Sequence, residues 1–270
     1  MTSFAACLTY DSRNQSALYF LSDSKITWGN SNYSWNVSRK TFVSRNTPNI
    51  FAYVGSAFIP TIIITQLIEQ IDLGMFENVS WTSEETHSKI VNQIEKSLKE
   101  INYQSQQCFT IIHGTRAGKG IKPDFKMWTT RFDKSGHLIS DYPEPFYKGY
   151  SALMSITGTG QTIVEELQKS TECLEITKTS RRAVHLFCKS LHEGKDQYSG
   201  GSPQMVGLIR IKNGQSYGFI WEGKKYLSGM EVSDLQNFDQ IEWRNSAFER
   251  CNGETGVRLK TASNHNLPVY

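Results

Sequence analysis

The chain has 270 residues, of which 38% are hydrophobic and 20% are charged. This is the composition of an ordinary globular protein, and the length is sufficient to bury a substantial core. The formal net charge is +3, from 29 basic and 26 acidic side chains. A charge this balanced predicts no nucleic-acid partner.

The sequence also shows no targeting signal and no disulfide pattern. The N-terminus lacks a basic region and a long apolar run, so we expect no signal peptide. The longest apolar run, residues 59–65, is too short to span a membrane, and we expect no membrane partner. The cysteines are scattered and odd in number, which favours reduced thiols in a cytoplasmic protein over disulfides or a zinc site. They are Cys7, Cys108, Cys173, Cys188 and Cys251.

The first half of the chain predicts strands followed by two helices. The expected strands are residues 4–10, 17–21, 40–43 and 50–54. Apolar residues spaced three and four apart after Pro60 indicate a helix that ends at Gly74. A second helix is expected to begin at Thr82, because Thr82 and Glu85 have the spacing of a capping box.

The second half repeats this order of strands, two helices and strands. The expected strands are residues 108–113, 125–131, 152–156, 205–211 and 217–221, and the expected helices are residues 162–169 and 181–193. In the last helix, Val184, Phe187 and Leu191 share one face. Each predicted helix therefore has an apolar side that must be covered.

This order of elements predicts the fold class. Two sheets packed face to face, with helices on both outer sides, would bury the apolar face of every helix. We therefore expect an α+β fold, a four-layer αββα sandwich, over residues 1–221. Residues 222–270 are polar and show little periodicity, so they are expected to be either a part of this domain or an assembly arm. Aromatic residues in this extension, such as Phe238 and Trp243, favour docking to a neighbouring subunit.

Five short motifs follow one another along the predicted elements. They are Asp-Ser-Lys-Ile-Thr-Trp-Gly at 23–29, Arg-Lys-Thr-Phe at 39–42, Phe-Ala-Tyr-Val-Gly at 51–55, Thr-Gly-Thr-Gly at 157–160 and Asp-Gln-Tyr-Ser-Gly-Gly at 196–201. In this order they resemble the motifs of proteasome β-subunits, including the HslV-type proteases and the Anbu-type proteins. The resemblance implies an N-terminal-nucleophile hydrolase with a proteasome-like sandwich fold.

By this resemblance, Thr2 is the nucleophile once Met1 has been removed. A threonine hydroxyl needs an adjacent base, and an α-amino group has a reference pKa of roughly 7.7–8.0. Lys40 would lie beside Thr2 and lower the pKa of its hydroxyl, while Asp23 would hold and orient Lys40. Thr2 precedes Asp23 by more residues than is usual in the family, which we attribute to a longer hairpin turn at residues 11–16.

The resemblance also implies the surroundings of the nucleophile. The amide of Gly55 would stabilise the oxyanion, because glycine has no side chain to block a close approach. Asp196, Ser199 and Thr159 would form a hydrogen-bonded surround for the threonine amine. Thr27 and Gly55 would flank a cleft in which an extended peptide substrate pairs as an added strand.

The expected function is that of a threonine-type peptidase or amidohydrolase that acts on peptides inside a self-compartmentalised oligomer. The expected partners are further copies of the chain in a ring, a peptide or unfolded-protein substrate, and an ATPase or adaptor. Two alternatives stay open: an acylase of the same kind acting on a small amide, and a non-catalytic structural subunit of a proteasome-like shell. No cofactor or metal is expected, because the histidines show no metal-ligand spacing.

Two further patterns resemble functional motifs and indicate none. Residues 114–120 lack the spacer and the Ser/Thr metal ligand of a phosphate loop, and they predict a basic surface turn. Cys7 lies inside an expected strand, which predicts a core thiol instead of a nucleophile.

Overall fold

The structure is a computed structural model of the chain. It describes residues 2–28, 33–77, 81–101, 108–118, 120, 123–133, 138–141, 149–170 and 178–262. Met1, parts of the segment between residues 118 and 150, and the end of the C-terminal extension, residues 263–270, lie outside the described residues.

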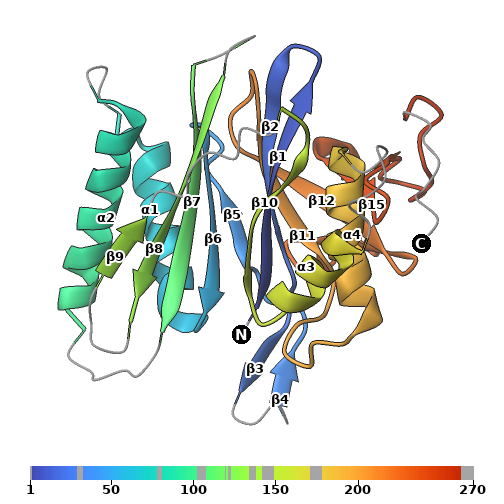
Figure 1. Cartoon of the computed structure of the whole chain (residues 1–270), viewed down its shortest axis with the longest axis horizontal. Coiled ribbons are helices and arrows are strands. Elements are labelled where there is room, and N and C mark those ends of the chain that lie inside the picture. Colours follow the sequence, from blue (N-terminus) through green and yellow to red (C-terminus); the bar gives the residue numbers. More distant parts are fainter. Residues whose placement is uncertain are drawn as a thin grey trace.

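The described residues form helices on two sides of a strand-rich centre (Figure 1). The helices are α1 (Phe58–Asp72), α2 (Ser83–Lys99), α3 (Gln161–Lys169), α4 (Ser180–Glu193) and the short 3-10 helix η2 (Phe238–Gln240). The strands are β1 (Ser3–Asp11), β2 (Asn14–Ser22), β3 (Ile26–Trp28), β4 (Tyr33–Trp35), β5 (Thr41–Val43), β6 (Asn49–Gly55), β7 (Phe109–Ala117), β8 (Asp124–Phe132), β9 (Leu138–Asp141), β10 (Ala152–Gly158), β11 (Gln204–Ile209), β12 (Gln215–Trp221), β13 (Lys224–Leu227), β14 (Met230–Glu231), β15 (Glu242–Asn245) and β16 (Arg250–Cys251). None of the helices in the described residues has the length and apolarity that a membrane-spanning helix needs.

The first strand, β1, lies in the interior of the larger sheet. It pairs with β2 on one side and with β10 on the other, both antiparallel. Side chains on successive residues of a strand point to opposite faces. Phe4 accordingly belongs to the apolar cluster that also contains Phe20 and Ile112, and Ala5 belongs to the cluster on the other face. The beginning of the chain is thus buried from both sides.

The helices α1 and α2 cover one face of the five-stranded sheet β5–β6–β7–β8–β9. Ile64 and Leu67 of α1 and Ile90 of α2 are buried in one cluster with residues of this sheet. The predicted capping box of α2 is confirmed, since the Thr82 side chain accepts from the Glu85 amide and the Glu85 carboxylate accepts from the Thr82 amide. On the other side of the molecule, α3 and α4 pack against the larger sheet.

The predicted fold class is wrong. We expected an α+β four-layer αββα sandwich, but the structure is mostly antiparallel β-sheet, with 39% strand and 26% helix. Within the described residues the strands form three sheets instead of two. The unexpected strands lie in polar or exposed segments, where the apolar alternation that predicts a strand is weak. The β3–β4 ribbon forms a separate sheet, and the strands from β13 to β16 enlarge the larger sheet to nine strands.

The described part of the C-terminal extension belongs to this larger sheet. Strand β12 pairs with β13 and, in parallel, with β15. Phe238, Trp243 and Phe248 of the extension are each less than 10% exposed, and they pack within their own chain. Their burial removes the reason for which we expected these aromatic residues to dock onto a neighbouring subunit.

Two histidines are buried under α2. His87 of α2 and His113 of β7 are joined through their Nδ1 atoms at 3.0 Å, so one nitrogen must donate and the other accept. His113 Nε2 lies 2.9 Å from Asn49 Oδ1, and His87 Nε2 lies 2.9 Å from the Ser140 hydroxyl. Because one of the facing Nδ1 atoms must accept, at least one of the two imidazoles is neutral. Burial lowers the pKa of His87 to about 4 and the pKa of His113 well below its usual value.

We expect this histidine pair to make the fold sensitive to acid. Both pKa values are depressed in the folded state, so the unfolded chain binds more protons below pH ~6.5 and stability falls as the pH drops from there towards 4. The slope of the unfolding free energy between pH 6 and pH 4.5 should be smaller in His87→Phe by about 1 kcal/mol per pH unit. Urea unfolding at several pH values measures this slope. The control variant is His192→Phe, at an exposed histidine. An unchanged slope in His87→Phe would contradict the prediction.

Candidate active site

The site is built where strands β1 and β10 meet at their ends. The Thr2 carbonyl accepts a hydrogen bond from the Thr159 amide at 2.9 Å, and Ser3 pairs with Gly158. Gly158 has φ +101°, and a Cβ at this position would lie 1.8 Å from the Thr2 carbonyl oxygen. Only glycine permits this approach. The same absent Cβ would lie 3.5 Å from the Val54 side chain, so the end of β6 is adjacent to Thr2 as well.

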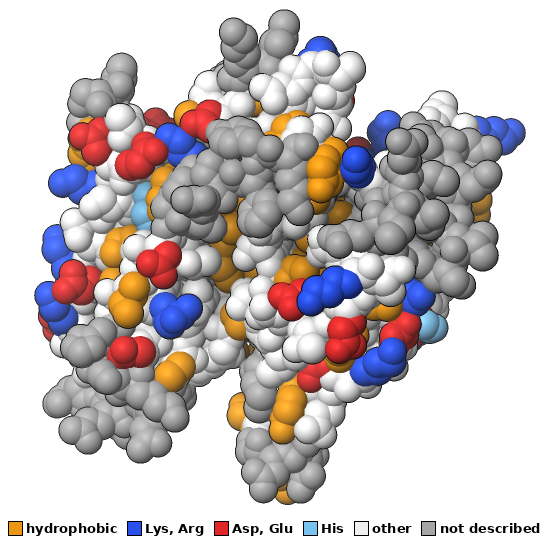
Figure 2. Space-filling model, viewed as in Figure 1, with side chains coloured by type: hydrophobic (Ala, Val, Ile, Leu, Met, Phe, Trp, Pro, Cys, Tyr) orange, Lys and Arg blue, Asp and Glu red, His pale blue; other side chains and the backbone are white. Residues whose placement is uncertain are grey.

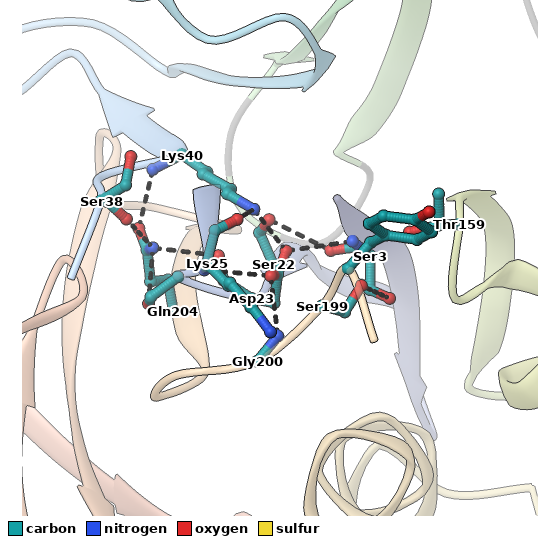
Figure 3. A network of polar contacts seen from close by, with 12 residues as sticks. Ser3, Ser22, Asp23, Lys25, Ser38, Lys40, Thr159, Ser199, Gly200 and Gln204 are labelled. Atoms are coloured by element: carbon teal, nitrogen blue, oxygen red, sulfur yellow. Dashed lines mark hydrogen bonds and ion pairs between the residues drawn. The ribbon is translucent and has the colours of Figure 1, made fainter. Parts of the chain in front are cut away.

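A fully buried ion pair lies beside this strand end (Figure 3). Lys40 Nζ is 2.7 Å from Asp23 Oδ1, and both side chains are 0% exposed. Lys40 Nζ also donates to the Lys25 carbonyl. Burial lowers the pKa of Lys40 below its usual value, and the Asp23 charge opposes this effect.

Asp23 connects this pair to the start of the chain. Its Oδ1, which accepts from Lys40, also accepts from the Ser3 amide at 3.0 Å. Its Oδ2 accepts from the amides of Lys25 at 3.1 Å and Gly200 at 3.0 Å. One carboxylate therefore binds Lys40, Ser3 at the start of β1 and the loop before β11.

A chain of hydroxyl groups begins at the side chain of Ser3, the residue that follows Thr2. Ser3 Oγ is 2.7 Å from Ser199 Oγ, which donates to Asp196 Oδ2 at 2.6 Å, and Thr159 Oγ1 donates to the same carboxylate oxygen at 2.6 Å. Gly160 makes room for this arrangement, because a Cβ there would lie 1.8 Å from Ser3 Oγ. Thr159 is exposed and Asp196 is half-buried, so this side of the site reaches solvent.

The hydroxyl of Thr2 differs from those around it. Thr2 is 1% exposed, and within the described part of the chain its Oγ1 has no hydrogen-bond partner. A buried hydroxyl without a partner costs free energy, and such groups in native proteins call for an explanation. A reacting group that must stay free to attack a substrate is one.

Two predicted substrate-binding residues lie on different sheets. Thr27 is the central residue of β3, and its Oγ1 is likewise buried without a partner in the described residues. Gly55 ends β6 with φ +100°, and a Cβ there would lie 2.5 Å from the Cys108 carbonyl oxygen. The positive φ and this close contact both require glycine.

Gln204 is a further site residue that the motifs did not indicate. Its side chain is 2% exposed and lies at the start of β11. Its Oε1 accepts from the Lys40 amide at 3.0 Å, and its Nε2 lies 2.6 Å from the Ser38 carbonyl and 3.1 Å from the Asp23 carbonyl. Glutamine in a strand carries no recognisable sequence signal. Its position just after the predicted Ser-Gly-Gly loop was the only available indication.

The chain matches no family model, and no curated protein matches it. Within the described residues, no group of three or more histidine, cysteine or acidic side chains is placed to hold a metal ion. The geometry of the site itself therefore carries the functional argument. It brings together Thr2, Asp23 and Lys40 at one end of β1, and Thr159, Asp196 and Ser199 beside them.

We expect the loss of one partner of the buried Lys40–Asp23 pair to destabilise the fold strongly. Asp23→Asn would leave a buried ammonium without its counter-charge and should lower the free energy of unfolding by about 3–5 kcal/mol. Lys99→Ala is the control, because it removes the exposed Lys99–Glu95 pair and should change this value by less than about 1 kcal/mol. Chemical denaturation measures both. Equal changes in the free energy of unfolding for the two substitutions would contradict this prediction.

Proposed function

We propose that the chain is a threonine-type peptidase or amidohydrolase of the N-terminal-nucleophile kind, with Thr2 as the nucleophile. The observation that carries the proposal is the Thr2 hydroxyl, which is buried and has no partner in the described residues. Thr2 directly precedes Ser3, whose amide donates to the carboxylate of the fully buried Lys40–Asp23 pair. The proposal rests on these side chains and on the motifs that resemble proteasome β-subunits.

The proposed reaction requires that water first hydrolyses the Met1–Thr2 peptide bond, which releases methionine and frees the α-amine of Thr2, because an amide nitrogen cannot act as a base. The free α-amine of Thr2 then accepts the hydroxyl proton as Oγ1 attacks the carbonyl carbon of the substrate. The amine passes this proton to the leaving nitrogen, and the C–N bond breaks to give an ester on Thr2. Water, deprotonated by the same amine, attacks the ester, and the proton returns to Oγ1.

Surrounding residues have separate roles in this proposal. The positive charge of Lys40 lowers the pKa of the Thr2 hydroxyl. Asp196 and Ser199, with Thr159, orient the amine through the hydroxyl chain that ends at Ser3. Gly55 is the proposed oxyanion donor, at the end of the strand adjacent to Thr2.

Burial disfavours one cysteine as an alternative nucleophile. Burial raises the pKa of Cys7 to about 12, so almost none of it is thiolate at neutral pH. Cys108 is exposed, and the cysteines in the described residues are free thiols. A cytoplasmic location stays part of the proposal because of the scattered, odd-numbered cysteines in the sequence.

A peptide is the proposed substrate. Strand β3 pairs only with β4 in the described residues, and a strand with an unpaired edge can accept an extended peptide. The unpartnered hydroxyl of Thr27 lies on this strand. On the face shown in Figure 2, acidic and basic side chains of the described residues are interspersed. The described side chains on this face form no basic patch of the kind that binds nucleic acid, and the proposal includes no nucleic-acid partner.

Thr2→Ala should abolish hydrolysis of fluorogenic peptides and leave the melting temperature nearly unchanged, because it removes a hydroxyl that has no partner in the described residues. A β-lactone probe should label Thr2, located by peptide mass spectrometry, and intact mass should show loss of Met1. Thr2→Ser keeps a hydroxyl and serves as the matched control, which should be labelled. Labelling of Cys108 in its place, or activity in Thr2→Ala, would reject the assignment.

The proposed site is expected to work inside an oligomer of identical chains, since a peptidase with an open site endangers other proteins. Light scattering of the purified protein should give a mass several times that of one chain, which is 30.7 kDa. A monomer that hydrolyses peptides would contradict the proposed oligomer but not the proposed reaction of Thr2. An ATPase or adaptor partner is part of the same proposal.

A further inference from the structure

The C-terminal extension reaches the candidate site through one hairpin turn. Ser228 and Gly229 connect β13 to β14, and both have positive φ, at +52° and +89°. Gly229 is buried, although β13 and β14 are the outermost strands of the main path through the larger sheet. A buried turn at a sheet edge must be packed against another segment.

The segment under this turn is the polar network around Gln204. A Cβ on Gly229 would lie 2.8 Å from Ser24 Oγ, 2.8 Å from the Ser38 carbonyl oxygen and 3.0 Å from Gln204 Nε2. These are the groups that Gln204 joins, since its Nε2 also lies 2.8 Å from Ser24 Oγ. The turn thus closes over this network with no space for even one methyl group.

The network determines where Lys40 lies. Ser24 directly follows Asp23 in the sequence, and Ser38 lies shortly before Lys40. The Ser38 amide donates to the Ser24 carbonyl at 2.9 Å. Gln204 Oε1 holds the backbone amide of Lys40 directly. A shift of Gln204 would therefore move the backbone on both sides of the Lys40–Asp23 pair.

We propose that the Gly229 turn is a positioning element of the candidate active site: by packing on Gln204 it holds Lys40 beside Thr2. The extension then completes the site within its own chain. This inference rests on the proposed function for its kinetic consequence, and on the geometry alone for its effect on Lys40. Gly229 and Gln204 touch no substrate in this scheme and act through Lys40.

A second hairpin turn of the extension provides a matched control. Glu222 and Gly223 connect β12 to β13, also with positive φ, at +50° and +80°. A Cβ on Gly223 would meet no atom within 4 Å. Gly223→Ala and Gly229→Ala therefore introduce similar backbone strain, and only Gly229→Ala presses on Gln204.

The test compares these variants by two measurements. The rate of Thr2 labelling by a β-lactone should fall about tenfold or more in Gly229→Ala, because displacements of about 1 Å in an active site have effects of this size or larger. Its pH profile should also shift, and Gly223→Ala should match the wild type in both. The side-chain ¹⁵N signal of Lys40, assigned by its loss in Lys40→Arg, should move in Gly229→Ala only.

The two measurements separate the two proposals. A wild-type protein that is never labelled at Thr2 refutes the proposed function, while a moving Lys40 signal would still support the positioning role. An unchanged Lys40 signal and labelling rate in Gly229→Ala overturn the inference, as do equal effects of both glycine variants. Should Gly229→Ala fail to fold, Gln204→Met tests the same network, and Gln215→Met on β12 is its control. A wild-type rate of Thr2 labelling in Gln204→Met would also overturn the inference.

Discussion

The Lys40–Asp23 ion pair is the interaction on which the candidate site depends. Two opposite charges with no exposed surface are stable only if further hydrogen bonds satisfy the remaining donors and acceptors. Asp23 fulfils this need with amides from β1 and from the loop before β11, and Lys40 with the Lys25 carbonyl. The pair therefore joins distant segments of the chain, and one of the residues held there, Ser3, directly follows Thr2.

The sequence predicted best those features that depend on local residue patterns. The α2 capping box needs only Thr82 and Glu85, and it formed as expected. The motifs that resemble proteasome β-subunits identified Asp23 with Lys40, and Asp196 with Ser199 and Thr159, and the structure brings each set into contact. What these residues catalyse stays a prediction.

Features that depend on long-range packing were missed. The strands of the extension are polar, so their pairing with β12 and with one another gave no alternating pattern, and the predicted sandwich did not account for them. Gln204 was not predicted because a single glutamine has no motif, although its side chain contacts two separate segments, residues 23–24 and 38–41. Ser3 was not predicted because its role in the hydroxyl chain depends on contact with Ser199, which is far away in the sequence.

The hydrogen bond between Ser3 and Ser199 joins residues 196 positions apart. Strand β1 can complete its pairing with β10, and Ser3 its hydrogen bond with Ser199, only after those later segments have been synthesised. Contacts of such long range form late in folding, because the intervening chain must first be ordered. A nascent chain that stops short of Asp196 therefore lacks the hydroxyl chain, so this part of the candidate site forms only when most of the domain is present.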